Sequence, residues 1–553
     1  MRTDVIRLYK SVHTWTGIVA GMALFIAFYA GALTMFKEPL ARWVSPPSAG
    51  AAAVPLEQAP ALIAQVLAQR PEAAQEFRLH LRQAEDVPAR MAWHVHNGPP
   101  GSVAEEAHHD ERKYFNATPD ASGRAQVLDA APTELAEFID TLHRVLGLPV
   151  DNDPSRILMG VICMLYAVAL VSGLIILLPT LLPDLFALRL GKNLKRMWLD
   201  AHNVVGLFSL PFHIVMAITA AVFAFHDGIY AVQDKVIHNG KLEVLWGRPP
   251  PPRAGPAPRD PALMLPPAEL ARRVQAIAPG FTPEMLQYTR VTSPRANVRV
   301  WGRDATGMTR SATGGFAVVD PYSGKVMNTD YLPGHQPAAN SVVTSFFTLH
   351  FGSFGGAPVT WMYFVLGLAG AFLFYTGNLL WVESRRKAAR GQAVVAQKRS
   401  TLLMAAATVG VCLGCVIGIS LSIAAGKWLH GHVAELGLWH KRVYYAAFFA
   451  AIAWALVRGA GRSAPQLLWA SALATLAIPL TTLAAWLVPA SGLWAHGSPA
   501  TLGVDAVALA GALCFAWMAW TSGRRARNGP QDSPWSAVPG AQDRPENRTP
   551  AAG

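Results

Sequence analysis

The chain has 553 residues, of which 52% are hydrophobic and only 15% are charged. Soluble domains carry about 25% charged residues, so this composition excludes an ordinary globular protein and, for most of the chain, intrinsic disorder. The net charge of +12 would suit a nucleic-acid binder, but lysine and arginine also collect in the cytoplasmic loops of membrane proteins. All four cysteines lie in apolar runs, which excludes a disulfide scaffold. We therefore expect contact with membrane lipid and not with nucleic acid.

A helix needs about 20 apolar residues to cross the hydrocarbon core of a bilayer. Six stretches have this length: 17–36, 157–182, 203–225, 351–382, 401–426 and 467–488. Two shorter stretches, 443–457 and 506–520, can span if their charged ends reach the interface. We therefore predict a polytopic α-helical membrane protein with about eight transmembrane helices.

Basic residues mark one side of the membrane. One cluster of Lys and Arg precedes the first span, and others follow the second, fourth, sixth and eighth spans. If the chain has eight spans, all of these clusters lie on the same side of the membrane. The positive-inside rule then places both termini in the cytoplasm of a bacterium, with the protein in the inner membrane. The apolar stretch at 17–36 is longer than the core of a signal peptide, so we expect it to remain as a helix.

Two long polar segments, about 44–142 and 227–347, separate the spans and are predicted to lie outside. Within the second, β-like runs at 296–301 and 315–320 lead into a turn that begins at Asp320. The proline-rich residues 249–258 are typical of an extended linker. These features divide the chain into a first repeat (1–182), a second repeat (183–400), four additional helices (401–523) and a disordered tail (524–553).

The repeat is visible in four histidines. His13 and His202 begin the first and third spans in the same H-x-x-x-G pattern, and His143 and His350 follow Thr-Leu ahead of the second and fourth spans. A unit of helix, outer domain and helix therefore occurs twice. It places two histidines near the inner face of the membrane and two near the outer face.

Histidine in or beside a span is costly and indicates function, through a proton relay, a metal ion or haem iron. The first two usually recruit acids or cysteines, of which the spans hold few. Bis-histidine haem needs one imidazole from each of two facing helices, so haem fits these residues best. A histidine that anchors or caps a helix is the simpler alternative. Slots for a macrocycle could be lined by the glycines of these spans: Gly17, Gly21, Gly31, Gly173, Gly206, Gly367, Gly370 and Gly377.

His213 follows His202 by eleven residues, so on a straight helix it would face the same way about 16 Å further along. It is a candidate haem ligand, or a polar group that fills the gap between two haems. Asp200 is expected to cap this helix or to orient the His202 imidazole. A third site could be formed by the histidines near the outer ends of the last four spans: His430, His432, His440 and His496.

Other chemistry-bearing residues have simpler interpretations. Cys412 and Cys415 lie in an apolar helix and are predicted to be small buried residues instead of a redox pair. The pairs His94-x-His96 and His108-His109 are more typical of a solvated surface than of a metal site. Four basic residues could either anchor the protein at the membrane surface or bind haem propionates, and both interpretations explain their positions equally well: Arg7, Lys10, Lys195 and Arg144.

The order of these motifs over about residues 5–385 resembles the PepSY-associated transmembrane family, and residues 319–326 are similar to the end of a PepSY domain. That family includes iron-regulated inner-membrane proteins and dihaem ferric-siderophore reductases. The resemblance implies two periplasmic α+β PepSY-like domains inserted in the tandem repeat. It also implies two b-type haems, which we pair by membrane level as His13 with His202 and His143 with His350.

These observations predict a transmembrane electron conduit, an oxidoreductase of iron acquisition. The sequence has no G-x-G-x-x-G motif for flavin or nicotinamide, so the electron donor would be quinol or a separate cytoplasmic reductase. The acceptor would be a ferric siderophore or another ferric chelate outside. One alternative is a membrane-anchored PepSY binding or regulatory module without redox activity. Another is a siderophore or iron transporter, for which broken helices or charged residues at the midplane would be expected; apart from His213 the sequence indicates none.

Overall fold

The computed structural model describes residues 3–47, 55–82, 89–96, 112–120, 122–130, 133–181, 194–241, 258–304, 307–311, 314–387 and 396–538. Most of the proline-rich stretch 249–258, the pair His108-His109 and the tail beyond 538 lie outside these ranges. The chain forms two compact units. The membrane unit contains residues 1–44, 133–224 and 364–553, and the sheet unit contains residues 45–132 and 225–363.

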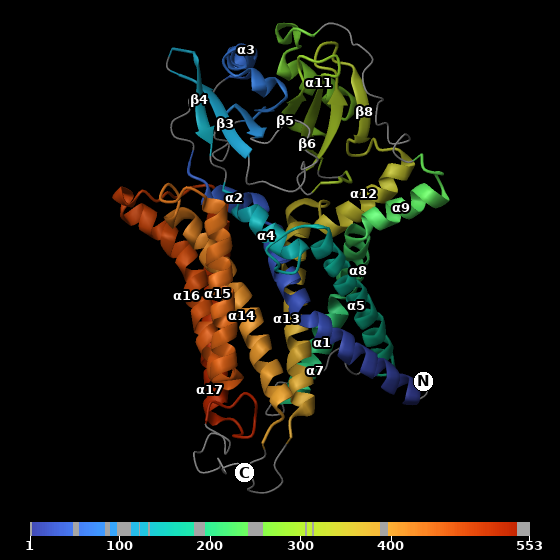
Figure 1. The fold of residues 1–553 in the computed structure, drawn as a ribbon, viewed down its shortest axis with the longest axis vertical. Coiled ribbons are helices and arrows are strands. Elements are labelled where there is room, and N and C mark those ends of the chain that lie inside the picture. The colour runs from blue at the N-terminus through green and yellow to red at the C-terminus, as the bar shows by residue number, and fades with distance from the viewer. Residues whose placement is uncertain are drawn as a thin grey trace, which may run out of the picture. The chain divides into compact units, whose positions relative to one another are not determined.

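The membrane unit is built of helices (Figure 1). Those of the first repeat are α1 (Thr3–Thr34), α2 (Lys37–Val44), α4 (Leu135–Arg144) and α5 (Asp153–Leu177). Those of the second are α7 (Leu194–Phe208), α8 (Leu210–Ala224) and α13 (Gly356–Arg385). The additional helices are α14 (Arg399–Trp428), α15 (Leu436–Arg458), α16 (Ala460–Leu487) and α17 (Pro499–Asn528).

Six helices in the described ranges are long and apolar enough to cross a membrane: α1, α5, α13, α14, α16 and α17. The bent pair α7–α8 makes a seventh if it is counted as one span. The short stretch 506–520 lies within the 30-residue helix α17 and is one of the six. The second short stretch, 443–457, lies within α15. This helix is not one of the six, because Lys441 and Arg442 reduce the hydropathy of its first turns. The protein is therefore a multi-pass membrane protein, and the eighth span stays a prediction.

The predicted span 203–225 is not a straight helix. It breaks at Ser209, and its two parts, α7 and α8, differ in direction by 69°. Pro211 explains the break, because proline has no amide hydrogen for the helix bond and its ring collides with the preceding turn. The expectation that His202 and His213 lie on one face of a continuous helix is therefore wrong.

Helix packing divides the membrane unit into two groups. In the first, α1 packs against α4 and α5, and α5 packs against α8. In the second, α14 packs against α15 and α16, and α16 packs against α17, so that these four helices lie side by side (Figure 1). One hydrophobic core joins the groups, because Phe138 and Leu142 of α4 are buried together with Cys415 of α14 and Tyr444 of α15.

The sheet unit contains one antiparallel sheet with strand order β4-β3-β2-β1-β5-β6-β7-β8. The first polar segment provides β1 (Glu76–His80), β2 (Met91–His96), β3 (Arg112–Pro119) and β4 (Ala125–Ala130). The second provides β5 (Thr282–Thr289), β6 (Asn297–Arg303), β7 (Gly315–Val319) and β8 (Val326–Tyr331). The strands predicted at 296–301 and 315–320 are confirmed as β6 and β7.

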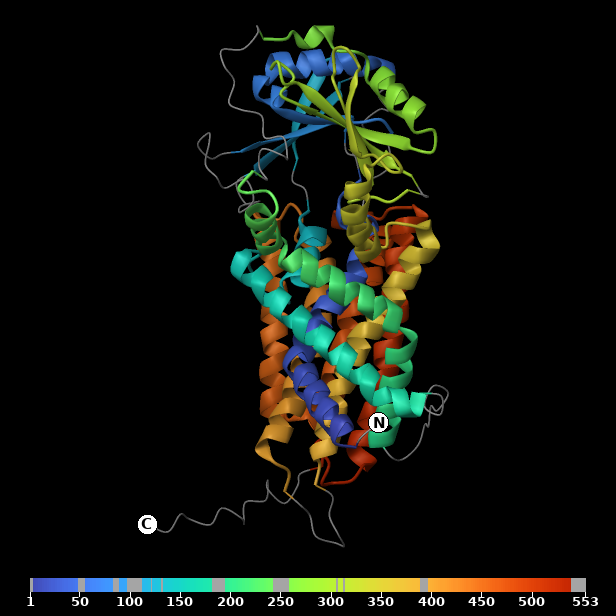
Figure 2. The same ribbon diagram turned by 90° about the vertical axis from the view of Figure 1, so that its right-hand side faces the viewer.

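One α-helix packs on the sheet from each polar segment and precedes its four strands, namely α3 (Ala59–Gln69) and α11 (Pro267–Ile277). The second segment also begins with α9 (His226–Val236). Figure 2 shows α3 and α11 over the sheet. Leu62 and Val66 of α3 and Leu270 and Val274 of α11 belong to the same hydrophobic core as the inward-facing strand residues. The two segments repeat one α–β order, but β1 pairs with β5, so they share a sheet and a core. The sequence predicted an outer domain in each segment and did not predict this shared sheet.

The predicted turn after β7 has a structural role. Asp320 Oδ1 accepts hydrogen bonds from the backbone amides of Tyr322 and Ser323 at 2.9 and 2.8 Å, and Arg259 Nη1 donates to Asp320 Oδ2 at 2.8 Å. Burial alone would raise the pKa of Asp320, but these donors together lower it below its usual value. Gly324 has φ of 70°, a conformation in which glycine avoids strain.

Candidate functional site

The structure brings together the two histidines predicted near the inner face. The rings of His13 in α1 and His202 in α7 have centroids 6.2 Å apart and planes inclined at 75°. One ring comes from each half of the repeat. The contact brings the two H-x-x-x-G segments, which are distant in sequence, next to each other.

Hydrogen bonds fix which nitrogen of each ring carries the proton. His13 Nδ1 lies 2.8 Å from Ala169 O in α5, and a carbonyl oxygen can only accept. His202 Nδ1 lies 3.2 Å from Thr376 Oγ1 in α13. The Thr376 hydroxyl donates its hydrogen to Leu373 O at 2.9 Å, so its oxygen accepts from His202. Both Nδ1 atoms are therefore donors, and in a neutral ring the lone pair lies on Nε2.

Glycines make room for both rings. A Cβ atom on Gly173 of α5 would lie 2.9 Å from His13 Cε1, closer than side-chain carbons approach. A Cβ atom on Gly377 of α13 would lie 3.5 Å from His202 Cε1. Two of the glycines that were predicted to line slots thus lie directly against the imidazoles.

His143, in α4, has the same environment at another place in the membrane unit. Its Nδ1 donates to Ala27 O in α1 at 2.7 Å, and a Cβ atom on Gly31 would lie 2.7 Å from that nitrogen. His350 occupies the corresponding place in the second repeat, near the end of the short helix α12 (Ala338–Phe351) that precedes α13. His143 belongs to the membrane unit and His350 to the sheet unit, so their pairing stays a prediction.

His213 is fully buried in α8 among aromatic rings. The Tyr166 hydroxyl of α5 is hydrogen-bonded to His213 Nδ1, and Phe28 and Phe374 pack against the imidazole with centroids 5.5 and 6.3 Å away. Within the described residues His213 Nε2 has no hydrogen-bond partner. A Cβ atom on Gly370 would lie 3.0 Å from His213 Cε1. His213 is therefore a polar group enclosed by aromatic side chains. Both of its interpretations, as a haem ligand and as a polar group between two haems, stay predictions.

The segment that carries these histidines matches a known protein family. The sequence profile described as the PepSY-associated TM region matches residues 10–384, which is more than half of the chain. The chain belongs to the PepSY-associated transmembrane family. A search of curated proteins finds no match. All five candidate histidines of this PepSY-associated protein lie inside the matched region, whereas α14–α17 lie beyond it.

Two charged residues near the histidines have structural partners. Asp200 does not cap α7, because the helix begins at Leu194; its buried carboxylate lies 3.1 Å from Arg196 Nε. Arg144, a candidate for binding a haem propionate, is paired with Asp151 and with Glu137 at 2.8 Å. The inner-side candidates are exposed: Arg7, Lys10 and Lys195.

The remaining candidates form no metal centre in the part of the chain that the structure describes, where no group of three or more His, Cys, Asp or Glu side chains could hold a metal ion. Cys412 and Cys415 are buried free thiols, as predicted. His94 in β2 lies beside the Tyr114 ring. His440 is fully buried, and within the described residues neither ring nitrogen has a partner.

The sequence did not predict two residues of the site, Tyr166 and Thr376. Tyr166 follows Cys163 in an apolar run, and Thr376 lies between Tyr375 and Gly377 in another. Their hydroxyl groups are the signal, because a buried hydroxyl in a span needs a hydrogen-bond partner. The partner itself depends on how the helices are rotated, which a single sequence does not determine.

Proposed function

We propose that this PepSY-associated protein is a haem-containing oxidoreductase of the inner membrane. It would accept electrons from quinol or a cytoplasmic reductase and reduce a periplasmic ferric siderophore or other ferric chelate for iron acquisition. The observation that carries this proposal is the pair of imidazoles, His13 and His202, each held by an Nδ1 hydrogen bond against a glycine.

The pair fits bis-histidine ligation. With metal–imidazole nitrogen bonds of about 2 Å, two imidazoles that share one iron have ring centroids roughly 6 Å apart. The His13–His202 distance of 6.2 Å agrees with this value. An ordinary edge contact between rings also spans about 4.5–7 Å, so the distance alone does not decide. The Nδ1 hydrogen bonds supply the second argument, because a ligating histidine characteristically donates its other ring N–H to a carbonyl or similar acceptor.

Haem held by two histidines would supply a one-electron carrier without an open coordination position, which suits electron transfer. The protein's own residues would fix the ligands. Ala169 O and Thr376 Oγ1 hold the tautomer that leaves Nε2 of His13 and His202 without a proton and able to ligate, and Ala27 O accepts from His143 Nδ1 in the same way. His350, His143 and His213 are the further candidates, and the first two would hold the second haem. Reduction of an oxygen-ligated ferric ion weakens its chelation and would release iron.

A transporter is the second candidate, because the α7–α8 span is broken by 69° and broken helices are typical of substrate sites in transporters. The break lies between His202 and His213. In a transporter these side chains would contact the cargo, and the purified protein would contain no haem.

The test is an absorption spectrum of the detergent-purified protein, oxidised and dithionite-reduced, with the haem-to-protein ratio. We expect a b-type spectrum with two haems per chain. His13→Ala and His202→Ala should each lose the same haem, and His143→Ala and His350→Ala should each lose the other. His226→Ala, in the sheet unit, is the control and should keep both. A colourless protein after expression with ample haem would contradict the proposal and support a carrier or anchor.

Activity is measured separately. The reduced protein should be reoxidised by ferric hydroxamate or ferric citrate complexes, with ferrous iron captured by a coloured chelator. A haem-loaded protein that no ferric chelate reoxidises would keep the haem assignment and refute the acceptor.

A further inference from the structure

A row of aromatic rings crosses the face of the sheet opposite α3 and α11. Trp301 of β6 and Phe316 of β7 are register partners with ring centres 4.5 Å apart, and Phe316 is stacked on Tyr331 of β8 at 4.7 Å. Side chains alternate between the two faces of a strand, and the neighbours Val300 and Ala317 belong to the helix-covered core. The rings themselves are partly exposed, so this aromatic row is a surface feature and not part of that core.

Two arginines lie over the aromatic row. Arg299 Cζ is 5.3 Å from the centre of the Phe316 ring, and Arg310 Cζ is 5.1 Å from the centre of the Tyr331 ring. Among the residues that the structure describes, neither arginine takes part in an ion pair. A guanidinium that stacks on a ring keeps N–H groups at its edge that can donate to another acceptor. The aromatic row therefore combines flat apolar surface with two positive charges.

One end of the aromatic row reaches the helix that carries His350. Arg310 Cζ also lies 5.6 Å from the centre of the Phe347 ring in α12. Next to it, Thr309 N donates to Thr348 Oγ1 at 3.0 Å, and the Thr348 hydroxyl donates back to Thr309 O at 2.9 Å. Figures 1 and 2 show α12 on the side of the sheet away from α3 and α11. A ligand on the aromatic row would therefore lie beside the helix of a candidate haem ligand.

These groups favour a ligand that is both anionic and aromatic. Guanidinium edges donate to anionic oxygens, and ring faces receive flat aromatic groups by offset stacking. Ferric chelates differ in these two properties. A catecholate complex is anionic and carries aromatic rings, a citrate complex is anionic without rings, and a hydroxamate complex carries no negative charge on its iron centre. Of these, the catecholate complex matches both parts of the aromatic row.

We propose that this surface binds an anionic ferric catecholate. The aryl rings of the chelate pack on Phe316 and Tyr331, and the guanidinium edges of Arg299 and Arg310 donate to the catecholate oxygens. The inference rests on the proposed function, for which it names the class of acceptor and the surface where the acceptor docks.

The test measures binding to the full-length protein in detergent, with gallium(III) in place of iron because it accepts no electron from the protein. Equilibrium dialysis compares the gallium complex of a hexadentate tris-catecholamide with gallium citrate and a gallium trihydroxamate. The wild type should bind the catecholate complex more tightly than the other two. Arg299→Gln/Arg310→Gln removes two charged donors and should weaken this binding roughly ten-fold or more.

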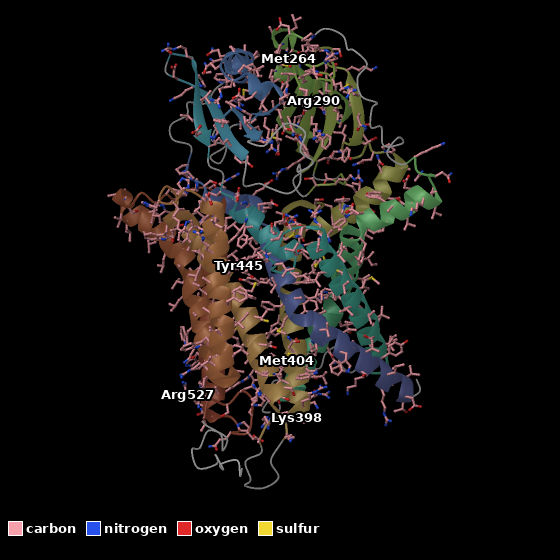
Figure 3. The ribbon with its side chains drawn as sticks, viewed as in Figure 1. Met264, Arg290, Lys398, Met404, Tyr445 and Arg527 are labelled. Carbon is pink, nitrogen blue, oxygen red and sulfur yellow. The ribbon has the colours of Figure 1, made fainter. Side chains whose placement is uncertain are left out.

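Arg290→Gln is the matched control for the arginine substitutions. Arg290 is exposed in the turn after β5, and Figure 3 shows it well away from α12. This variant should bind the gallium catecholate as the wild type does.

Val318→Glu is a second variant in case the double substitution does not fold. Val318 is the register partner of Arg299 and lies on the same face as Phe316, so a glutamate there would pair with the arginine and repel an anion. Val318→Gln has the same shape without the charge. Binding of the gallium catecholate should fall in Val318→Glu and be retained in Val318→Gln.

The outcomes separate this inference from the proposed function. Catecholate binding that no variant weakens, or equal affinity for gallium citrate, would overturn the inference even if the protein contains haem and reduces ferric chelates. A colourless protein that binds the gallium catecholate through these arginines would refute the proposed function and support the docking surface.

Discussion

At the scale of single residues, His13, His143 and His202 share one arrangement. Each of these imidazoles approaches a backbone carbonyl, directly or through a hydroxyl group, at a point where the residue four positions later is glycine. Because residues i and i+4 are neighbours on a helix surface, a side chain at i+4 would block the approach. The pairs are Ala27 with Gly31, Ala169 with Gly173 and, through the Thr376 hydroxyl, Leu373 with Gly377.

This arrangement predicts that Gly173→Ala disturbs the inner site. The added methyl carbon would meet His13 Cε1 at 2.9 Å, so the ring must move away from Ala169 O. We expect haem at the His13–His202 site to fall by half or more, measured from the reduced spectrum, with the helices intact by circular dichroism. Gly511→Ala in α17 meets only Thr475 at 3.6 Å and is the control. Full haem content in Gly173→Ala would show that the glycine is dispensable.

The sequence predicted which kinds of residue form the inner site, namely histidines and glycines. The repeated spacing identified His13 and His202, and the glycines of the spans were expected to line slots. Which glycine meets which histidine was not predictable, because that depends on helix rotation. Tyr166 was missed for the same reason, since its hydroxyl meets His213 from a different helix.

At the scale of elements, the apolar stretches predicted the spans well, but not the break in α7–α8. Length and hydropathy average over some 20 residues, whereas one proline, Pro211, changes the direction of the chain. The proline was visible in the sequence. The sequence did not determine whether Pro211 would break the helix, because neighbouring helices can accommodate proline within a span.

The turn between β7 and β8 gives an element-scale prediction. Asp320→Ala removes the acceptor for Tyr322 and Ser323 and the partner of Arg259, so it should destabilise this hairpin by about 1–3 kcal/mol. The pKa of Asp320 is lower in the folded protein, so its stabilisation is present above its unfolded pKa, near 4, and is lost as pH falls through the folded value.

Hydrogen exchange of the β7 and β8 amides in the full-length protein measures this effect. The difference in protection between wild type and Asp320→Ala should be largest near neutral pH and should shrink below about pH 4. Arg295→Ala, in the loop before β6, is the control. A difference that stays constant down to pH 3 would show that the Asp320 charge does not contribute.

The additional helices also act at this scale. Phe138 and Leu142 of α4 are buried against α14 and α15, and Tyr445 donates to Gly147 O at 3.0 Å just beyond α4. These contacts support the helix that carries His143. The apolar stretches of the sequence predicted helices at 401–523 but did not indicate that these helices contact α4.

At the scale of the whole molecule, the sheet unit contains a strand pairing that sequence patterns do not predict. Two strands of the second segment, β6 and β7, were predicted from their β-like runs. The pairing between β1 and β5 was not, because it links residues far apart in sequence. Phe77 of β1 and Tyr288 of β5 are register partners, both fully buried, with stacked rings 4.5 Å apart. This contact lies at the junction of the two segments.

Phe77→Ala should therefore destabilise both segments together. Truncation of a buried phenylalanine costs about 3–5 kcal/mol through lost burial and the cavity that remains. We expect β2–β4 and β6–β8 to lose hydrogen-exchange protection by similar amounts in the full-length variant. Leu128→Ala on the exposed side of β4 is the control. Loss confined to β1–β4 would show that the segments fold independently.

The shared sheet also constrains synthesis. β1 ends at His80 and β5 begins at Thr282, and the helices α4, α5, α7 and α8 are made in between. At 5–20 residues per second, β5 leaves the ribosome on the order of ten seconds or more after β1. During that interval the open edge of β1 can pair with other chains, a hazard typical of exposed strand edges. Biogenesis of this protein therefore requires protection of a half-finished sheet until α5, α7 and α8 have been made and β5 has emerged.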